Sequence, residues 1–234
     1  MGTAVHNSVE EICNNDLAGH DGDEVGLLPT KANANLEKQW EERKGNFLQT
    51  PRHPRWKQEE YPRARKLLIG SLNILFAKAR TGKIALSEVS IDTWRNIQEM
   101  VLAAEGTLRT SCGRLMGRLD LLVSDYDDEG NVVGWIVADL KTGKPPDGEL
   151  YDTVSRQLRF YRSILCENNP DHPPVRAEGW YSNDSVIFEA DVPSLLPEAF
   201  EQLESSKTTD TPMDAKPNDM ACSFYDWKAR RAVV

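Results

Sequence analysis

The sequence contains no apolar run as long as the ~18 residues that a membrane-spanning helix requires. Its first residues, MGTAVHNSVEEIC, also lack the basic start and the apolar core of a secretory signal. Both absences argue against a membrane protein and a secreted one. They predict a cytoplasmic protein with no membrane partner.

Cysteine and histidine are scarce, and neither is grouped as metal ligands usually are. No C-x-x-C pair occurs among the four cysteines, so neither a zinc knuckle nor a disulfide framework is indicated. The thiols are expected to be reduced and mostly structural. The histidines show no ligand-like spacing, and we expect them in loops or at the surface: His6, His20, His53 and His172.

Lysine and arginine are absent from the first thirty residues, which carry six acids. Residues 52–83 have the opposite balance, nine bases against two acids, so the net charge of -9 conceals a segregated charge. A solvated helix face is the commonest explanation of such a basic run when it stands alone. Residues 1–34 are polar, acidic and aperiodic, and they predict a disordered tail able to bind a protein partner.

Hydrophobic periodicity predicts one domain over residues 35–205 and an irregular tail over 206–234 that packs on it. Helical spacing occurs at 62–82, 92–105, 149–167 and 193–205, and strand-like runs occur at 83–91, 114–124, 131–141, 175–181 and 185–191. The acids and the glycine of DYDDEG predict a hairpin turn between the second and third strands. This order predicts an α/β fold with a central mixed β-sheet flanked by helices.

The stretch GWIVADLKTGK, residues 134–144, places two opposite charges on one side of an otherwise apolar strand. Asp139 and Lys141 point to the same side because side chains alternate along a strand, and Asp120 lies on the preceding strand. Burying unpaired charges is costly, and a bound divalent cation would offset that cost. Two carboxylates and a backbone carbonyl, that of Leu140, are hard oxygen ligands that suit Mg²⁺ or Mn²⁺ better than zinc.

Lys141 cannot ligate a cation, so its chemical role would be toward the substrate or toward water. It could orient or deprotonate an attacking water, or stabilise the charge that develops on a phosphoryl group. An Asp–Lys ion pair at a strand end is the commoner explanation of DLK taken alone. Downstream, Gln157 and Tyr161 are four residues apart and share one face of a predicted helix.

Six residues match, in order, the motifs G-x-x-D, D-x-K and Q-x-x-x-Y: Gly117, Asp120, Asp139, Lys141, Gln157 and Tyr161. Over residues 113–191 the chain resembles the RecB-like branch of the PD-(D/E)XK nuclease superfamily. The resemblance implies a restriction-endonuclease-like core. It also implies a Mg²⁺- or Mn²⁺-dependent nuclease of single- or double-stranded DNA, an exonuclease more readily than an endonuclease.

The same resemblance implies a role for each matched residue. Asp120, Asp139 and the Leu140 carbonyl would hold the metal, and Lys141 would act on the nucleophilic water. The remaining pair would support the site or the substrate strand: Gln157 and Tyr161.

Two features depart from the pattern of the family. Many members add a histidine ligand from an N-terminal helix, whereas the basic helix over 62–82 contains none. His53 is a weak substitute, and Glu59, Glu60 or Glu88 could supply a carboxylate instead. Some relatives end in a cysteine-ligated iron–sulfur cluster. PNDMACSFYDW retains only Cys222 of such a set, so we predict no cluster.

Basic side chains are the expected phosphate contacts of a nuclease, here Arg63, Lys66, Arg118, Lys144, Arg156 and Arg159. A different hypothesis is a nuclease fold with weak catalysis that serves as a nucleic-acid-binding or interaction module within a repair, defence or phage complex. The missing histidine favours that module, and the intact Asp-Asp-Lys set favours the enzyme. A third hypothesis, an ordinary α/β interaction domain, is disfavoured by the order of the motifs.

Overall fold

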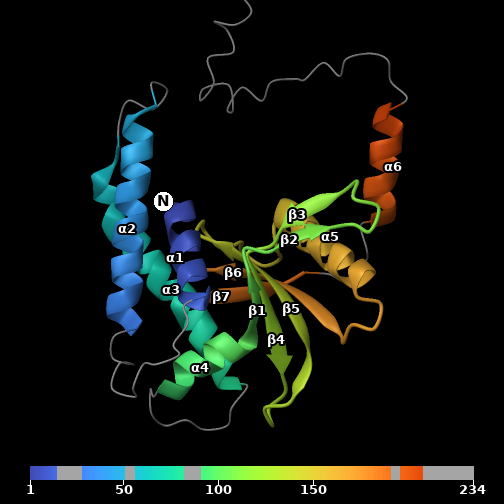
Figure 1. Cartoon of the computed structure of the whole chain (residues 1–234), viewed down its shortest axis with the longest axis horizontal. Coiled ribbons are helices and arrows are strands. Elements are labelled where there is room, and N and C mark those ends of the chain that lie inside the picture. The colour runs from blue at the N-terminus through green and yellow to red at the C-terminus, as the bar shows by residue number, and fades with distance from the viewer. Residues whose placement is uncertain (15–27, 51–55, 82–90, 191–195, 208–234) are drawn as a thin grey trace, which may run out of the picture.

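The computed structural model describes residues 1–14, 28–50, 56–81, 91–190 and 196–207 (Figure 1). Its helices are α1 (Gly2–Asn14), α2 (Leu28–Leu48), the short 3-10 helix η2 (Gln58–Glu60), α3 (Tyr61–Thr81), α4 (Ile91–Met100), α5 (Asp152–Asn168) and α6 (Leu196–Lys207). Its strands are β1 (Val101–Ala104), β2 (Thr107–Arg109), β3 (Met116–Arg118), β4 (Leu121–Tyr126), β5 (Val132–Lys141), β6 (Val175–Tyr181) and β7 (Val186–Glu189).

Five strands form one mixed sheet in the order β1-β4-β5-β6-β7, with β5 at its centre. β5 and β6 are parallel, and α5 provides the crossover that a parallel pair requires. Side chains of β5 alternate between two cores: Ile136 and Ala138 pack with α1, α2 and α3, and Val137 packs with α5 on the opposite face. The predicted α/β fold with a mixed sheet flanked by helices is confirmed.

Two predicted elements are divided in the structure. The helix predicted over 92–105 ends at Met100, because residues 101–104 pair with β4 and form β1. The strand predicted over 114–124 is interrupted at Leu119 and Asp120. β3 pairs with β2 in a separate two-stranded sheet, while β4 joins the main sheet. The strand predicted over 83–91 lies outside the described residues except for Ile91, where α4 begins.

The predicted disordered tail over residues 1–34 is wrong for residues 2–14, which form α1, and for residues 28–34, which begin α2. Val5, Val9 and Ile12 recur at helical spacing and are fully buried in the core shared with α2 and α3. Figure 1 shows α1 between α2 and the sheet. Helix α1 therefore belongs to the folded domain. The acidic residues between α1 and α2 lie outside the described ranges.

The C-terminal part of the described chain follows the prediction more closely. α6 covers Leu196–Lys207, where the sequence predicts a helix over 193–205. The predicted irregular tail lies outside the described residues from position 208 onward. Among the helices of the described ranges, none combines the length and the apolar character that crossing a membrane requires.

Gly70 allows α3 to lie directly against the turn after β6. A Cβ added there would overlap the carbonyl oxygen of Ser182, a backbone atom that cannot shift alone. We expect Gly70→Ala to destabilise the fold by about 2 kcal/mol or more, because the overlap must displace α3 from the sheet. Gly45→Ala in α2 is the matched control. A Cβ there meets nothing within 4 Å, and alanine favours a helix. Thermal melts followed by circular dichroism compare the variants, and equal melting temperatures would contradict the close contact.

Candidate metal centre

The candidate site forms where the ladder between β4 and β5 stops. The last pair is Leu121 with Ala138, and beyond it the Asp120 side chain takes the place of a backbone acceptor. Asp120 Oδ2 accepts a hydrogen bond of 2.7 Å from the Leu140 N–H. The N–H and C=O of one strand residue point to the same neighbour. The Leu140 carbonyl is therefore directed toward Asp120 as well, as a third oxygen ligand would have to be.

Asp139 is the buried carboxylate of this site, with 3% of the residue exposed. Its side chain lies within hydrogen-bonding reach of Asp120 and forms an ion pair with Lys141, on the same side of β5. Burial and the negative charge of Asp120 raise the pKa of Asp139 to about 6, although the Lys141 ammonium opposes the shift. The structure thus brings Asp120, Asp139 and Lys141 together, as the alternation of the strand predicted.

A chain of hydrogen bonds joins β5 to α5. The Lys141 ammonium donates to Gln157 Oε1 at 3.1 Å, and Gln157 Nε2 donates to the Tyr161 hydroxyl at 2.9 Å. The first motif has a glycine at position 117 because the Tyr161 ring lies against it, and a Cβ at that position would overlap the ring. The six motif residues therefore occupy one connected site, although they come from separate elements of the chain.

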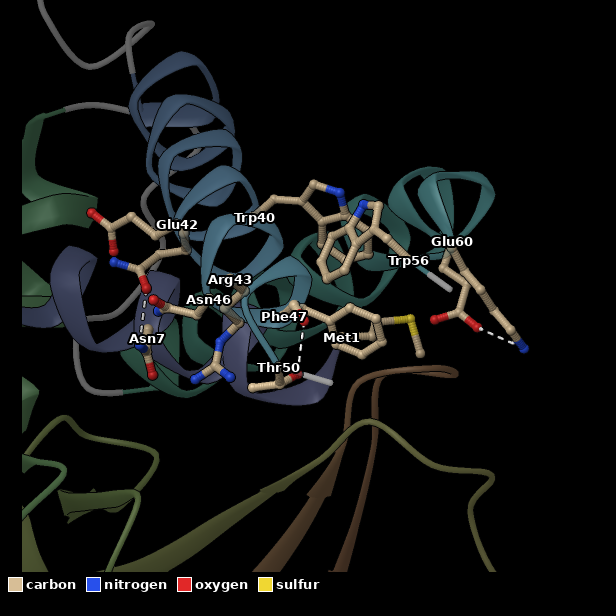
Figure 2. Close-up of a pocket in the computed structure, with 12 residues that line it drawn as sticks. Met1, Asn7, Trp40, Glu42, Arg43, Asn46, Phe47, Thr50, Trp56 and Glu60 are labelled. Carbon is tan, nitrogen blue, oxygen red and sulfur yellow. Dashed lines mark hydrogen bonds and ion pairs between the residues drawn. The ribbon is translucent and has the colours of Figure 1, made fainter. Parts of the chain in front are cut away.

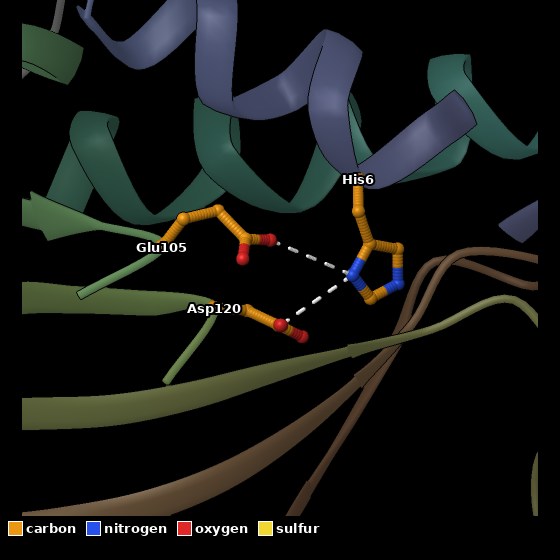
Figure 3. A group of neighbouring side chains, drawn as sticks. All are labelled: His6, Glu105 and Asp120. Atoms are coloured by element: carbon orange, nitrogen blue, oxygen red, sulfur yellow. Dashed lines mark ion pairs between the residues drawn. The ribbon is translucent and has the colours of Figure 1, made fainter. Parts of the chain in front are cut away.

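His6 of α1 points toward the carboxylates of Glu105 and Asp120 (Figure 3). Its Nδ1 is 3.4 Å from Asp120 Oδ1 and 3.9 Å from Glu105 Oε1. One ligand atom from each of His6, Glu105 and Asp120 lies within 4.8 Å of the other two, which is close enough for all three to hold one metal ion. The sequence predicted a loop or surface position without ligand-like spacing for His6, whereas this histidine is on a helix, is partly buried and faces the site.

The electrostatics of the cluster fit a bound cation. Burial opposes protonation of His6, but its hydrogen bond to Asp120 and the charges of Asp120, Glu105 and Asp139 together raise its pKa. Burial and the Asp120 charge likewise raise the pKa of Glu105, against the opposing charge of Arg118. The raised pKa values of His6 and Glu105 both show that the cluster favours added positive charge, which a proton supplies. A divalent cation bound by the histidine nitrogen and the carboxylate oxygens would supply positive charge at the same place.

Glu105 is the second residue that the sequence reasoning did not select. Its φ of 53° lies in the left-handed region, which a residue with a side chain adopts at a cost. The turn is held because the Glu105 N–H donates to the Asp120 carbonyl at 2.7 Å and the Leu119 N–H donates to the Gly106 carbonyl at 2.9 Å. The strained turn thus places Glu105 beside Asp120. The sequence suggested Glu59, Glu60 or Glu88 as the carboxylate that could replace a histidine ligand. Glu59 and Glu60 lie on η2, and Glu88 is outside the described residues.

The structure separates the basic residues expected to contact phosphate. Arg118 forms a 2.6 Å ion pair with Glu105 at the edge of the site, and Lys144 pairs with Asp147 in the loop after β5. Two others, Arg63 and Lys66, are exposed on α3, on one face of the sheet. α5 covers the opposite face and carries Arg156 and Arg159. Arg118 and Lys144 lie on segments next to the carboxylates, and Arg156 and Arg159 lie on the helix that supplies Gln157 and Tyr161.

The central strand of the mixed sheet brings an Asp-x-Lys pair to a cluster of carboxylates and a histidine. Such a cluster could hold a divalent cation of the kind that assists phosphoester hydrolysis. A comparison with family models matches residues 1–229 to the PD-(D/E)XK nuclease superfamily, and the chain belongs to this superfamily. Membership makes the protein a metal-dependent nuclease, with nucleic acid as its substrate. The match includes α1 and so His6. A comparison with curated proteins finds no match.

Proposed function

We propose that the protein is a RecB-like exonuclease that hydrolyses DNA with Mg²⁺ or Mn²⁺. The observation that carries the proposal is the continuous set of contacts from Tyr161 through Lys141 and Asp139 to Asp120 and His6. In the proposed assignment the metal ligands are Asp120, Asp139, the Leu140 carbonyl and His6. Glu105 lies close enough to add a carboxylate, directly or through water.

Each remaining residue has a task that follows from its contacts. A bound divalent cation would supply Lewis-acid chemistry, polarising the phosphoryl group and lowering the pKa of the attacking water. Lys141 is held from two sides, by Asp139 and by Gln157, so its ammonium is fixed where it can orient water or stabilise developing charge. Gln157 and Tyr161 are positioning residues, because Gln157 accepts from Lys141 and donates to Tyr161, which fixes the Gln157 amide.

Lys141→Ala should separate binding from turnover. The ammonium is not a metal ligand, so the affinity for Mn²⁺ should stay within a fewfold of that of the wild type. The kcat should fall by ~10² or more, which is the effect expected when a group that acts on the transition state is removed. Calorimetric metal titration and a cleavage time course measure the two quantities. A collapse of metal affinity would assign Lys141 a structural role instead.

The proposed activity is tested with four substrates: linear DNA labelled at its ends and circular DNA, each in single-stranded and double-stranded form. The purified protein is incubated with each in Mg²⁺, in Mn²⁺ and in EDTA. An exonuclease shortens linear DNA and leaves circles intact, and EDTA stops the reaction. Cleavage of circles would replace the exonuclease assignment with an endonuclease. No cleavage of any substrate in either metal would overturn the enzymatic proposal.

The alternative of a catalytically weak binding module loses its main support. It rested on the absence of a histidine near the metal ligands, and His6 lies 3.4 Å from Asp120. The complete set of ligands and Lys141 therefore favours an active enzyme over a module that only binds nucleic acid.

A further inference from the structure

A cavity of about 660 Å³ lies between α1, α2 and the segment that leads into α3 (Figure 2). Its lining contains two kinds of side chain. One wall is aromatic and consists of Trp40, Phe47 and Trp56. The other is polar and includes Asn7, Arg43, Asn46 and Thr50. None of these residues takes part in the metal centre described above.

The aromatic wall is a packed platform. The Trp40 and Trp56 rings meet edge to face with centroids 4.9 Å apart, and Phe47 meets Trp56 in the same manner at 5.5 Å. Trp40 is buried behind the platform, whereas Trp56 and Phe47 are only half-buried. Gln58 Oε1 accepts from both indole N–H groups, at 3.3 Å from Trp40 and 2.8 Å from Trp56. The two partly exposed rings are thus held in place before any ligand arrives.

The polar wall offers hydrogen bonds without an excess of charge. Arg43 Nε is buried and has no hydrogen-bond partner within the part of the chain that the structure describes. In Figure 2 the Arg43 side chain reaches down between Asn7 and Thr50. The charged side chains that line the cavity are balanced, with two cations and two carboxylates: Arg43, Lys57, Glu42 and Glu60. Such a cavity suits a planar neutral group with a polar edge better than it suits a phosphate.

The cavity and the metal centre lie on neighbouring sides of α1. His6 faces the metal centre, and the next residue, Asn7, lines the cavity. Met1 lines the cavity as well, while Gly2 lies against Thr142, one residue after Lys141, with a built Cβ only 2.9 Å from the Thr142 hydroxyl. A strand that passes the metal centre therefore needs to cross only the width of one helix, about 10 Å, to reach the aromatic wall.

We propose that this cavity binds an unpaired nucleobase of the strand whose phosphodiester lies at the metal centre. The base would stack on Trp56 and Phe47, and Arg43 and Asn46 would offer hydrogen bonds to its edge. The inference rests on the proposed nuclease function and narrows its substrate to single-stranded nucleic acid. A base within a duplex is already stacked and paired, and entering the cavity would require the loss of both interactions.

Binding in EDTA tests the cavity without any catalysis. Fluorescence anisotropy compares a labelled single-stranded oligonucleotide with one of equal length built from abasic nucleotides. Trp56→Ala should weaken binding of the normal oligonucleotide about tenfold, the size expected for one base–aromatic stack, and should leave the abasic one unaffected. Trp56→Phe keeps a ring and should bind nearly as well as the wild type. Arg43→Gln should weaken binding, and Lys44→Gln, a change to the half-buried neighbour that does not line the cavity, is the matched control.

A cleavage assay in Mn²⁺ distinguishes the failure of the proposed nuclease activity from the failure of the proposed base-binding cavity. Trp56→Ala should raise the KM for the oligonucleotide about tenfold and leave hydrolysis of bis(p-nitrophenyl) phosphate, a small diester without a base, unchanged. If the wild type hydrolyses neither substrate, the nuclease proposal fails while the binding result still stands. Equal affinity of wild type and Trp56→Ala, or equal affinity of the wild type for normal and abasic strands, would overturn the cavity assignment. If Trp56→Ala does not fold, Arg43→Gln and Lys44→Gln decide the question.

Discussion

Replacing Asp139 with asparagine should reduce cleavage below detection and, in EDTA near neutral pH, raise the melting temperature of the protein. Both effects have one origin. Asp139 is buried beside the Asp120 carboxylate, and in the absence of a cation its negative charge is only partly balanced by Lys141. Asparagine removes the repulsion, but it is a poorer ligand because it carries no charge. Asp120→Asn should also abolish cleavage, since Asp120 contacts both His6 and the Leu140 N–H.

The stabilising effect of Asp139→Asn should depend on pH in a defined direction. The pKa of Asp139 is about 6 in the folded protein, above the 3.8 of an exposed aspartate. A raised pKa means that the folded state favours the protonated acid. The contribution of Asp139 to stability is therefore present in full below about pH 4 and is lost as pH rises through 6. The difference in melting temperature between Asp139→Asn and the wild type should grow from pH 5 to pH 8.

Two controls connect this result to a metal. Asp128→Asn changes an exposed carboxylate in the turn between β4 and β5 and should alter neither cleavage nor melting. Saturating Mn²⁺ should raise the melting temperature of the wild type at pH 8 and have a much smaller effect on Asp139→Asn, because a ligand that binds only the folded state stabilises it. An active Asp139→Asn variant, with folding verified by circular dichroism, would remove Asp139 from the metal site.

Strand β5 and its charged pair could be predicted from the sequence because their signals are local. A continuous apolar run identifies β5, and the alternation of a strand places Asp139 and Lys141 on one side. The order of the motifs then adds Asp120, Gln157 and Tyr161. The structure brings all five together, through contacts that require only one sheet and its crossover helix.

The remaining part of the cluster depends on contacts between distant segments. His6 reaches Asp120 only because α1 packs in the core, and the acids and polar residues around Val5, Val9 and Ile12 conceal their helical spacing. The helical spacing of these three apolar residues is the sequence signal that could have predicted α1. Glu105 follows a segment whose helical periodicity is overridden by pairing with β4, so its position in a strained turn beside the site has no local signature. The packing of α1 in the core decides the first case and the pairing of β1 with β4 decides the second, and neither contact is encoded in a short window of sequence.

Deleting residues 1–14 should unfold most of the protein at room temperature, the reverse of what a disordered tail would predict. Val5, Val9 and Ile12 are fully buried, and each buried aliphatic side chain stabilises a fold by about 1.5–3 kcal/mol. Three such losses approach the whole stability of a typical domain, about 5–15 kcal/mol. Circular dichroism and gel filtration measure the result. A soluble, compact truncated protein with an unchanged melting temperature would show that α1 is dispensable for the fold.

The role of His6 requires a milder change, because a deletion removes the core and the ligand together. His6 is partly exposed, so His6→Ala should leave the fold intact. It should weaken Mn²⁺ binding by about tenfold or more, since even residues that only support a ligand cost that much when they are lost. His172→Ala is the matched control: its Nδ1 contacts the Pro173 carbonyl, in the loop before β6. Unchanged Mn²⁺ affinity in His6→Ala would exclude His6 as a ligand, and Glu105→Gln would then test whether the second carboxylate completes the site.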